Sequence, residues 1–203
     1  MDKDTKNALL SRLRAYACNP DDDIILIKEK IKAALLQCPE LLYALNNNSL
    51  EDELFDKNGE LLIDGEWDRY FGDNGNIRPF VFFPQVQTDV SNYVCYKVEF
   101  TEVPRYNSIE KYTHVTFVIL VSGGNIIDKD TGIPRHDLLS SIIRERFNWS
   151  NIFGTQCKLI ENKESITDTN YVTRTLVFEL TSLNAIVKTN HNNTSIINNV
   201  VRK

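Results

Sequence analysis

Glu161 and Lys163 are the residues whose types and spacing come nearest to a catalytic pair. An acidic residue two positions before a lysine on a strand occurs in two-carboxylate, metal-dependent nucleases. Such a site needs a further carboxylate from a neighbouring strand to hold magnesium. Glu179 or Glu99 could supply it, but nothing in the sequence places either beside Glu161. A solvated strand end explains the pair more simply, so a small metal-dependent nuclease is the alternative hypothesis.

Other catalytic signatures are missing from the sequence, which contains no P-loop, GxGxxG, GxSxG, HExxH or paired CxxC motif. Residues 56–60 and 128–132 faintly resemble calcium loops. Neither stretch has a glycine at the sixth position or a glutamate at the twelfth. We therefore expect no enzymatic activity, no cofactor, and no catalytic, cofactor-binding or metal-ligating residue.

The cysteines and the first residues indicate a reducing compartment. The chain begins with polar and acidic residues and has no apolar segment typical of a secretory signal. No apolar run approaches the roughly 20 residues that cross a bilayer. We expect four free, largely buried thiols. These are Cys18, Cys38, Cys95 and Cys157.

Charge is unevenly distributed along the 203 residues, which carry 23 Lys and Arg against 28 Asp and Glu, a net charge of −5. This balance argues against a general binder of nucleic acid or membrane surfaces, because phosphate neutralisation needs a basic face. Residues 51–68 hold eight acids and one base, so the rest of the chain is nearly neutral. We call these eight acids the acidic collar. They are Glu51, Asp52, Glu53, Asp56, Glu60, Asp64, Glu66 and Asp68.

Hydrophobic periodicity predicts the elements that must position these residues. The expected helices are residues 5–17, 24–38, 39–45 and 134–147. The expected strands are residues 77–86, 93–103, 113–121, 156–161 and 171–183. Pro79 and Pro84 favour an edge position or irregular structure for the first strand. Apolar residues on both faces favour a central position for residues 113–121.

The domain organisation follows from the same pattern. We expect an N-terminal helical segment (residues 1–50), a core (51–183) and an extended C-terminal tail (184–203). The thirteen residues 122–134 form a loop long enough to suggest a function.

Several side chains are candidates for subunit or partner contacts. Arg135, Arg144 and Arg146 could form a basic patch on the outer face of one helix, although such charges more often face solvent. Trp67, Tyr70, Phe71 and Trp149 are expected to be exposed, and such residues are enriched at interface centres. Plugging the ends of the sheet core explains them equally well. The full candidate set adds Asp128, Asp130, Ile196 and Ile197.

The order of elements resembles the tail-terminator and tail-to-head joining proteins of tailed phages. The likeness covers about residues 61–183 and includes the strand THVTFVILV, the helix HDLLSSIIRERF and the strand YVTRTLVFEL. It implies an α+β fold in which a small mixed, mainly antiparallel sheet packs against one long amphipathic helix. The N-terminal helical segment is longer than in that family, and the C-terminal tail is an addition.

The resemblance implies a structural virion protein, assembled in the host cytoplasm, that forms a homo-oligomeric ring in the neck or tail. Its partners would be copies of itself, adjoining portal or tail proteins, and DNA passing through the lumen without sequence-specific binding, with no membrane. A neck ring of a short-tailed phage or a non-catalytic adaptor remains open. Loop 122–134, the hairpin at 163–168, the sheet edge at 77–86 and the tail would contact neighbours.

Repetition of residues 51–68 around such a ring would make the acidic collar continuous. We expect it to repel DNA phosphates, so that the genome slides past, or to meet a basic partner ring. A solvated hairpin is the simpler explanation of the same residues.

Overall fold

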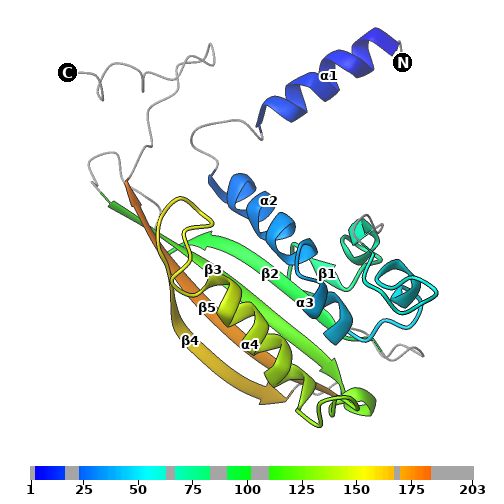
Figure 1. The fold of residues 1–203 in the computed structure, drawn as a ribbon. Coiled ribbons are helices and arrows are strands. Elements are labelled where there is room, and N and C mark those ends of the chain that lie inside the picture. Colours follow the sequence, from blue (N-terminus) through cyan, green and yellow to red (C-terminus); the bar gives the residue numbers. More distant parts are fainter. Residues whose placement is uncertain are drawn as a thin grey trace.

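The core of the protein is a five-stranded sheet, which a computed structural model places in the order β1-β2-β3-β5-β4 (Figure 1). The structure describes residues 3–16, 23–62, 67–82, 91–101, 110–166 and 170–183. The strands are β1 (Ile77–Arg78), β2 (Tyr93–Phe100), β3 (Glu110–Ser122), β4 (Cys157–Ile166) and β5 (Tyr171–Leu183). All neighbouring pairs are antiparallel except β1 with β2. The predicted α+β class with a mainly antiparallel sheet is confirmed.

Strand β3 is the central strand, as its two apolar faces predict. On one face its side chains are fully buried under the helices and join those of β5. These are Val115, Phe117, Ile119, Val121, Leu176 and Phe178. On the other face a smaller cluster forms around Leu120, Tyr93, Cys95 and Tyr171. The helices therefore cover the central strands on one side of the sheet, and a smaller apolar cluster forms on the other side.

The helices α2 (Asp23–Leu36), α3 (Pro39–Ala44) and α4 (Arg135–Phe147) cover the same face of the sheet (Figure 1). Phe147 at the end of α4 packs on Phe117 and Phe178, with ring centroids 5.0 and 6.2 Å apart. Tyr96 of β2 donates a hydrogen bond of 3.2 Å to the carbonyl of Lys28 in α2. The amphipathic stripes predicted from helical spacing thus meet one shared core.

Helix α1 (Lys3–Tyr16) stands clear of the sheet and of the helices that cover it (Figure 1). Its leucines Leu9, Leu10 and Leu13 are exposed. The predicted helix is confirmed, but its apolar stripe finds no covering surface among the described residues.

Two predicted turns are also present. Gly59 adopts φ +81° between the bridge partners Phe55 and Leu61, which suits the Asn-Gly hairpin turn. At the second turn, a Cβ on Gly75 would lie 2.3 Å from the backbone oxygen of Tyr70, so only glycine fits there.

The predicted strand at residues 77–86 is wrong in length. Only Ile77 and Arg78 pair with β2, at the edge of the sheet, and residues 79–82 leave the ladder. Pro79 has no N–H to donate, which is the physical reason for the early end. Residues 83–86 lie outside the described residues.

Arg135 joins the loop 122–134 to the helices. Its Nη1 donates to the carbonyl of Ala44, the last residue of α3, at 2.7 Å, and its Nε donates to the carbonyl of Asn125 at 3.2 Å. Its Nη2 lies 2.8 Å from Asp128 Oδ1. The carbonyls at a helix C-terminus need donors, and a guanidinium supplies several in a fixed geometry.

The expectation that Arg135 faces outward in a basic patch is therefore wrong, because its side chain is 3% exposed. Asp128 is also buried, and it accepts hydrogen bonds from the amide and hydroxyl of Thr131 at 3.0 and 2.7 Å. Burial alone would raise the pKa of Asp128, but the bonds from Thr131 and the charge of Arg135 outweigh it and hold the pKa below its ordinary value.

Asp128→Asn should lower the free energy of unfolding by about 3 kcal/mol at neutral pH, because it leaves Arg135 buried without its counter-charge. Since the folded-state pKa is lowered, this stabilisation is present above the ordinary Asp pKa and is lost as pH falls through the folded value. Urea unfolding should show the difference from wild type shrinking below about pH 4. Asp130→Asn, which alters only an exposed hydrogen bond to Tyr43, is the control. Equal losses in both variants would contradict a special role for Asp128.

Candidate functional site

The described members of the acidic collar lie on two short 3-10 helices, η1 (Glu51–Glu53) and η2 (Trp67–Tyr70), and in the turn at residues 56–60. The indole N–H of Trp67 donates to the carbonyl of Glu53 at 3.1 Å, and Arg69 forms an ion pair with the Glu53 carboxylate. Lys32 of α2 lies 3.1 Å from Asp68. These contacts hold the collar against the helical layer.

The collar residues differ in exposure. Glu53 and Asp56 are half-buried, and their carboxylates bind nearby groups of the same segment. Asp56 accepts the amides of Asn58 and Glu60 at 2.8 Å each, and its pKa is lowered, chiefly by the bond from Glu60. Asp64 and Glu66 lie outside the described residues. The collar members that face solvent are Glu51, Asp52, Glu60 and Asp68.

Tyr70 is buried, which corrects the prediction that it is exposed. Its hydroxyl donates to the carbonyl of Leu50 at 3.0 Å, and burial raises its pKa to about 12. Trp67 and Phe71 are half-buried and pack against the main core. The sequence does not reveal this burial, because the same pattern of aromatic residues beside a polar turn occurs in a core and at an interface.

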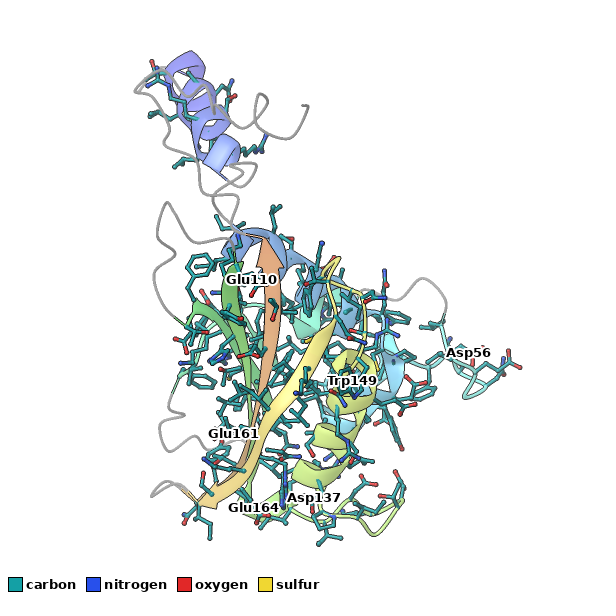
Figure 2. All side chains as sticks on the ribbon, turned by 90° about the vertical axis from the view of Figure 1, so that its left-hand side faces the viewer. Asp56, Glu110, Asp137, Trp149, Glu161 and Glu164 are labelled. Carbon is teal, nitrogen blue, oxygen red and sulfur yellow. The ribbon has the colours of Figure 1, made fainter. Side chains whose placement is uncertain are left out.

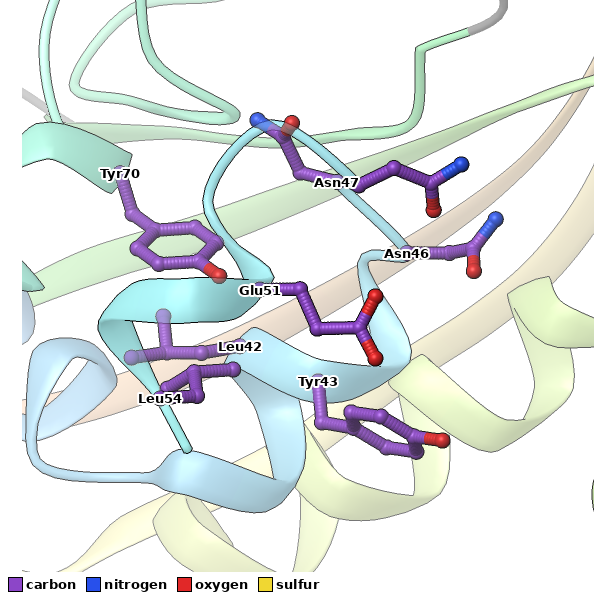
Figure 3. A pocket seen from close by; sticks show the side chains of 8 residues that line it. Leu42, Tyr43, Asn46, Asn47, Glu51, Leu54 and Tyr70 are labelled. Carbon is purple, nitrogen blue, oxygen red and sulfur yellow. The ribbon is translucent and has the colours of Figure 1, made fainter. Parts of the chain in front are cut away.

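Two hollows flank the collar. A cavity of about 40 Å³ lies between α3, η1 and η2 (Figure 3). It is lined by Leu42, Tyr43, Asn46, Asn47, Asn48, Glu51, Leu54 and Tyr70. It has room for a few waters, far less than an organic ligand needs. A wider groove of about 400 Å³, the α2–η2 groove, is lined by Glu29, Lys32, Ala33, Leu36, Gln37, Trp67 and Asp68.

The loop 122–134 has a buried side and an exposed side. Asp128 is turned inward, whereas Ile127 and Ile133 are 54% and 43% exposed. Asp130 accepts a hydrogen bond of 2.7 Å from Tyr43. The loop thus presents two isoleucines on a backbone that the Arg135 contacts hold in place.

The end of α4 presents Trp149, which is 57% exposed. Its φ of +61° lies in the left-handed region, which is unfavourable for a bulky residue. Its backbone N–H donates to the carbonyl of Cys157 at 2.6 Å, and the amide of Cys157 donates to the carbonyl of Ser150 at 3.1 Å, so these bonds to the first residue of β4 hold the conformation. Arg144 and Arg146 are exposed on the same helix, as predicted.

A polar cluster that the sequence did not reveal joins α4 to β4 and β5. His136 Nε2 lies 3.5 Å from Glu164 and 3.8 Å from Asp137. Arg174 pairs with both carboxylates and with the Asn162 side chain. Figure 2 shows Asp137 and Glu164 side by side. The only advance signal is that Arg174 interrupts the apolar alternation of its strand.

Among the described residues, His136, Asp137 and Glu164 form the group of three possible metal ligands. The geometry does not fit a resident metal, because the Arg174 guanidinium already contacts both carboxylates. A cation would have to displace that charge from a largely buried position. The cluster is therefore best described as an ion-pair network that attaches α4 to the sheet.

Glu161 and Lys163 lie together on the sheet face opposite the helices. A β-bulge at Ile160 shifts the register so that Glu161 faces away from α4, and its carboxylate lies 3.0 Å from Lys163 Nζ. Glu179 contacts His114 at 3.4 Å, and Glu99 pairs with Lys97 at 2.6 Å. The described part of the chain contains no group of three ligands that includes Glu161.

The remaining predicted residues are either buried cysteines or lie outside the described ranges. Cys38, Cys95 and Cys157 are free and buried, as expected. Cys18, residues 167–168 of the hairpin, the tail, and with it Ile196 and Ile197, lie outside the described residues. No helix within the described ranges has the length and apolar character needed to cross a membrane.

Fold and surfaces together define a small α+β protein that exposes apolar side chains on the loop 122–134, at the end of α4 and on α1, among other places. Residues 39–180 match the model of the YomW family, and this is well over half of the chain. The chain therefore belongs to the YomW family. The family name derives from an SPBc2-like prophage region of Bacillus, which indicates a phage-associated protein. No curated protein matches the chain.

The thiols of Cys95 and Cys157 should resist labelling by a thiol reagent in the native protein at pH 8, because burial raises the pKa of each to about 12. Denaturation should expose both. Mass spectrometry of labelled peptides measures this site by site. Rapid native labelling of either residue would contradict the described packing.

Trp149→Gly should leave the free energy of unfolding within about 1 kcal/mol of wild type, because glycine adopts the left-handed conformation freely and the indole is exposed. Trp67→Gly, which removes a half-buried indole and its hydrogen bond, should lose about 3 kcal/mol. Urea unfolding of both variants provides the comparison. A large loss for Trp149→Gly would show that its indole supports the fold.

Proposed function

We propose that this YomW-family protein is a structural virion component that forms a homo-oligomeric ring in the neck or tail of a tailed phage. In that role it joins the head, through its portal or connector, to the tail and lets DNA pass without sequence-specific binding. The phage association of the family supports this setting. The α+β core, a mainly antiparallel sheet covered on one face by α2, α3 and α4, agrees with the architecture that such a role implies.

The observation that carries the proposal is the loop 122–134. The side chains of Ile127 and Ile133 are exposed to solvent on one side of this loop. The other side of the loop is anchored by the ion pair between Asp128 and Arg135. A rigid loop loses little conformational entropy when a partner covers it, so such a surface is suited to binding.

Trp149 supplies a second surface of the same kind. Tryptophan and arginine are enriched at interface centres, and Trp149 lies at the end of the helix that exposes Arg144 and Arg146. A closed ring requires two unlike surfaces on each subunit, because its contacts run head to tail. The loop and the α4 end are chemically unlike in this way.

The exposed acids of the collar have a role in the same proposal. Four carboxylates without a buried partner would form a continuous acidic band in a ring, which repels DNA phosphates or meets a basic neighbouring ring.

Neutralising Glu51 and Asp52 together should then slow genome passage or weaken assembly. Unchanged particle yield and infectivity would remove the collar from the proposal.

Proteomic analysis of purified phage particles tests the function directly. We expect the chain in the particle, and we expect Ile127→Asp with Ile133→Asp to reduce its incorporation about tenfold or more, since each change places a charge in a covered contact. Ile160→Asp, at an exposed isoleucine of the β4 bulge, is the matched control.

Absence of the expressed protein from particles would overturn the proposal. Incubation of the purified chain with DNA and magnesium tests the nuclease alternative. Cleavage that is lost in Glu161→Gln would support that alternative instead, whereas intact DNA would remove it.

A further inference from the structure

Helix α1 has a strong charge and an apolar stripe that no other described part of the chain covers. Leu9, Leu10 and Leu13 are 39–63% exposed and lie on one face, as their spacing dictates. The helix carries four basic residues, Lys3, Lys6, Arg12 and Arg14, against Asp4. An isolated helix of 14 residues is marginal in water, so a contact that buries the stripe would stabilise it.

The α2–η2 groove has the complementary chemistry. Its floor includes Ala33, Leu36 and Trp67. Its rim carries the exposed acids Glu29 and Asp68 and one base, Lys32, which pairs with Asp68. The η1 and η2 helices beside it hold most of the described acidic collar. Its volume of about 400 Å³ accepts leucine side chains of a helix laid along it.

We propose that α1 of one copy docks into the α2–η2 groove of a second copy. The leucine stripe covers the apolar floor, and the basic side chains face the acidic rim. Because α1 and the groove are unlike surfaces on the same chain, repetition of this contact runs head to tail and closes a ring when the rotation permits. The inference names the subunit contact of the ring and rests on the proposed function for its biological setting.

The linker lets α1 reach a neighbour. Six residues, 17–22, join α1 to α2 and span up to about 25 Å when extended. The same length also permits α1 to fold back onto its own groove. Figure 1 shows α1 standing away from the body, which agrees with exchange between copies.

Sedimentation velocity of the full chain, over a range of concentrations, tests the contact with two variants. Leu9→Gln with Leu13→Gln removes the stripe but keeps good helix formers. Ala33→Arg blocks the groove with a bulky cation at an exposed helical position. Each should weaken self-association about tenfold or more, while Ile160→Asp should associate like wild type. The unfolding curve of the body should be unchanged in the α1 variant.

Mixing the two variants distinguishes exchange from folding back. The stripe variant keeps its groove and the groove variant keeps its α1, so docking between copies predicts a one-to-one complex that grows no further. A wild-type chain that stays monomeric, variants that associate like wild type, or a mixture that forms no complex would each overturn the inference. Stripe-dependent binding to vesicles of phosphatidylcholine and phosphatidylglycerol, in place of self-association, would also overturn it.

Different results would contradict the neck or tail role and the contact between α1 and the α2–η2 groove. Association through α1 in a protein absent from phage particles would contradict the neck or tail role and leave this contact standing. A ring found in particles whose assembly ignores the stripe would keep that role and remove this contact.

Discussion

One buried guanidinium fixes how the parts of this protein meet. Arg135 satisfies the last carbonyl of α3, a carbonyl of the loop 122–134 and the Asp128 carboxylate, all from the first residue of α4. A buried ion pair is stable only when its geometry and additional hydrogen bonds compensate for lost hydration, and Thr131 supplies these to Asp128. The helical layer and the loop therefore share one anchor.

The surfaces follow from that anchor. With α3 fixed against α4, the segment that follows α3 and carries the acidic collar is placed beside α2, where Lys32 meets Asp68. Because the loop 122–134 is held on its inner side, the side chains of Ile127 and Ile133 on its outer side are exposed to solvent. Most buried polar side chains form hydrogen bonds or ion pairs within the protein. Several apolar side chains on the loop 122–134 and at the end of α4 are exposed to solvent.

Much of the architecture could be predicted from periodicity, because each long element needs one buried face. The helix at 134–147, the central strand and the final strand begin and end close to the predicted residues. The burial of Arg135 and Tyr70 could not be predicted, since it depends on the Ala44 and Leu50 carbonyls, which are distant in sequence. The β4 bulge and the pairing of Arg174 with Asp137 and Glu164 likewise depend on register, which a single strand's pattern does not specify.

The candidate contacts divide in the same way. The exposure of Trp149 is expected from the sequence, whereas its left-handed backbone conformation is visible only in the structure. A cryo-electron-microscopy reconstruction of the purified chain tests the account most directly. We predict a closed ring of copies in which each α1 lies in the α2–η2 groove of its neighbour and the loop 122–134 is covered. Isolated single copies at every concentration, with the loop and the groove both bare, would contradict it.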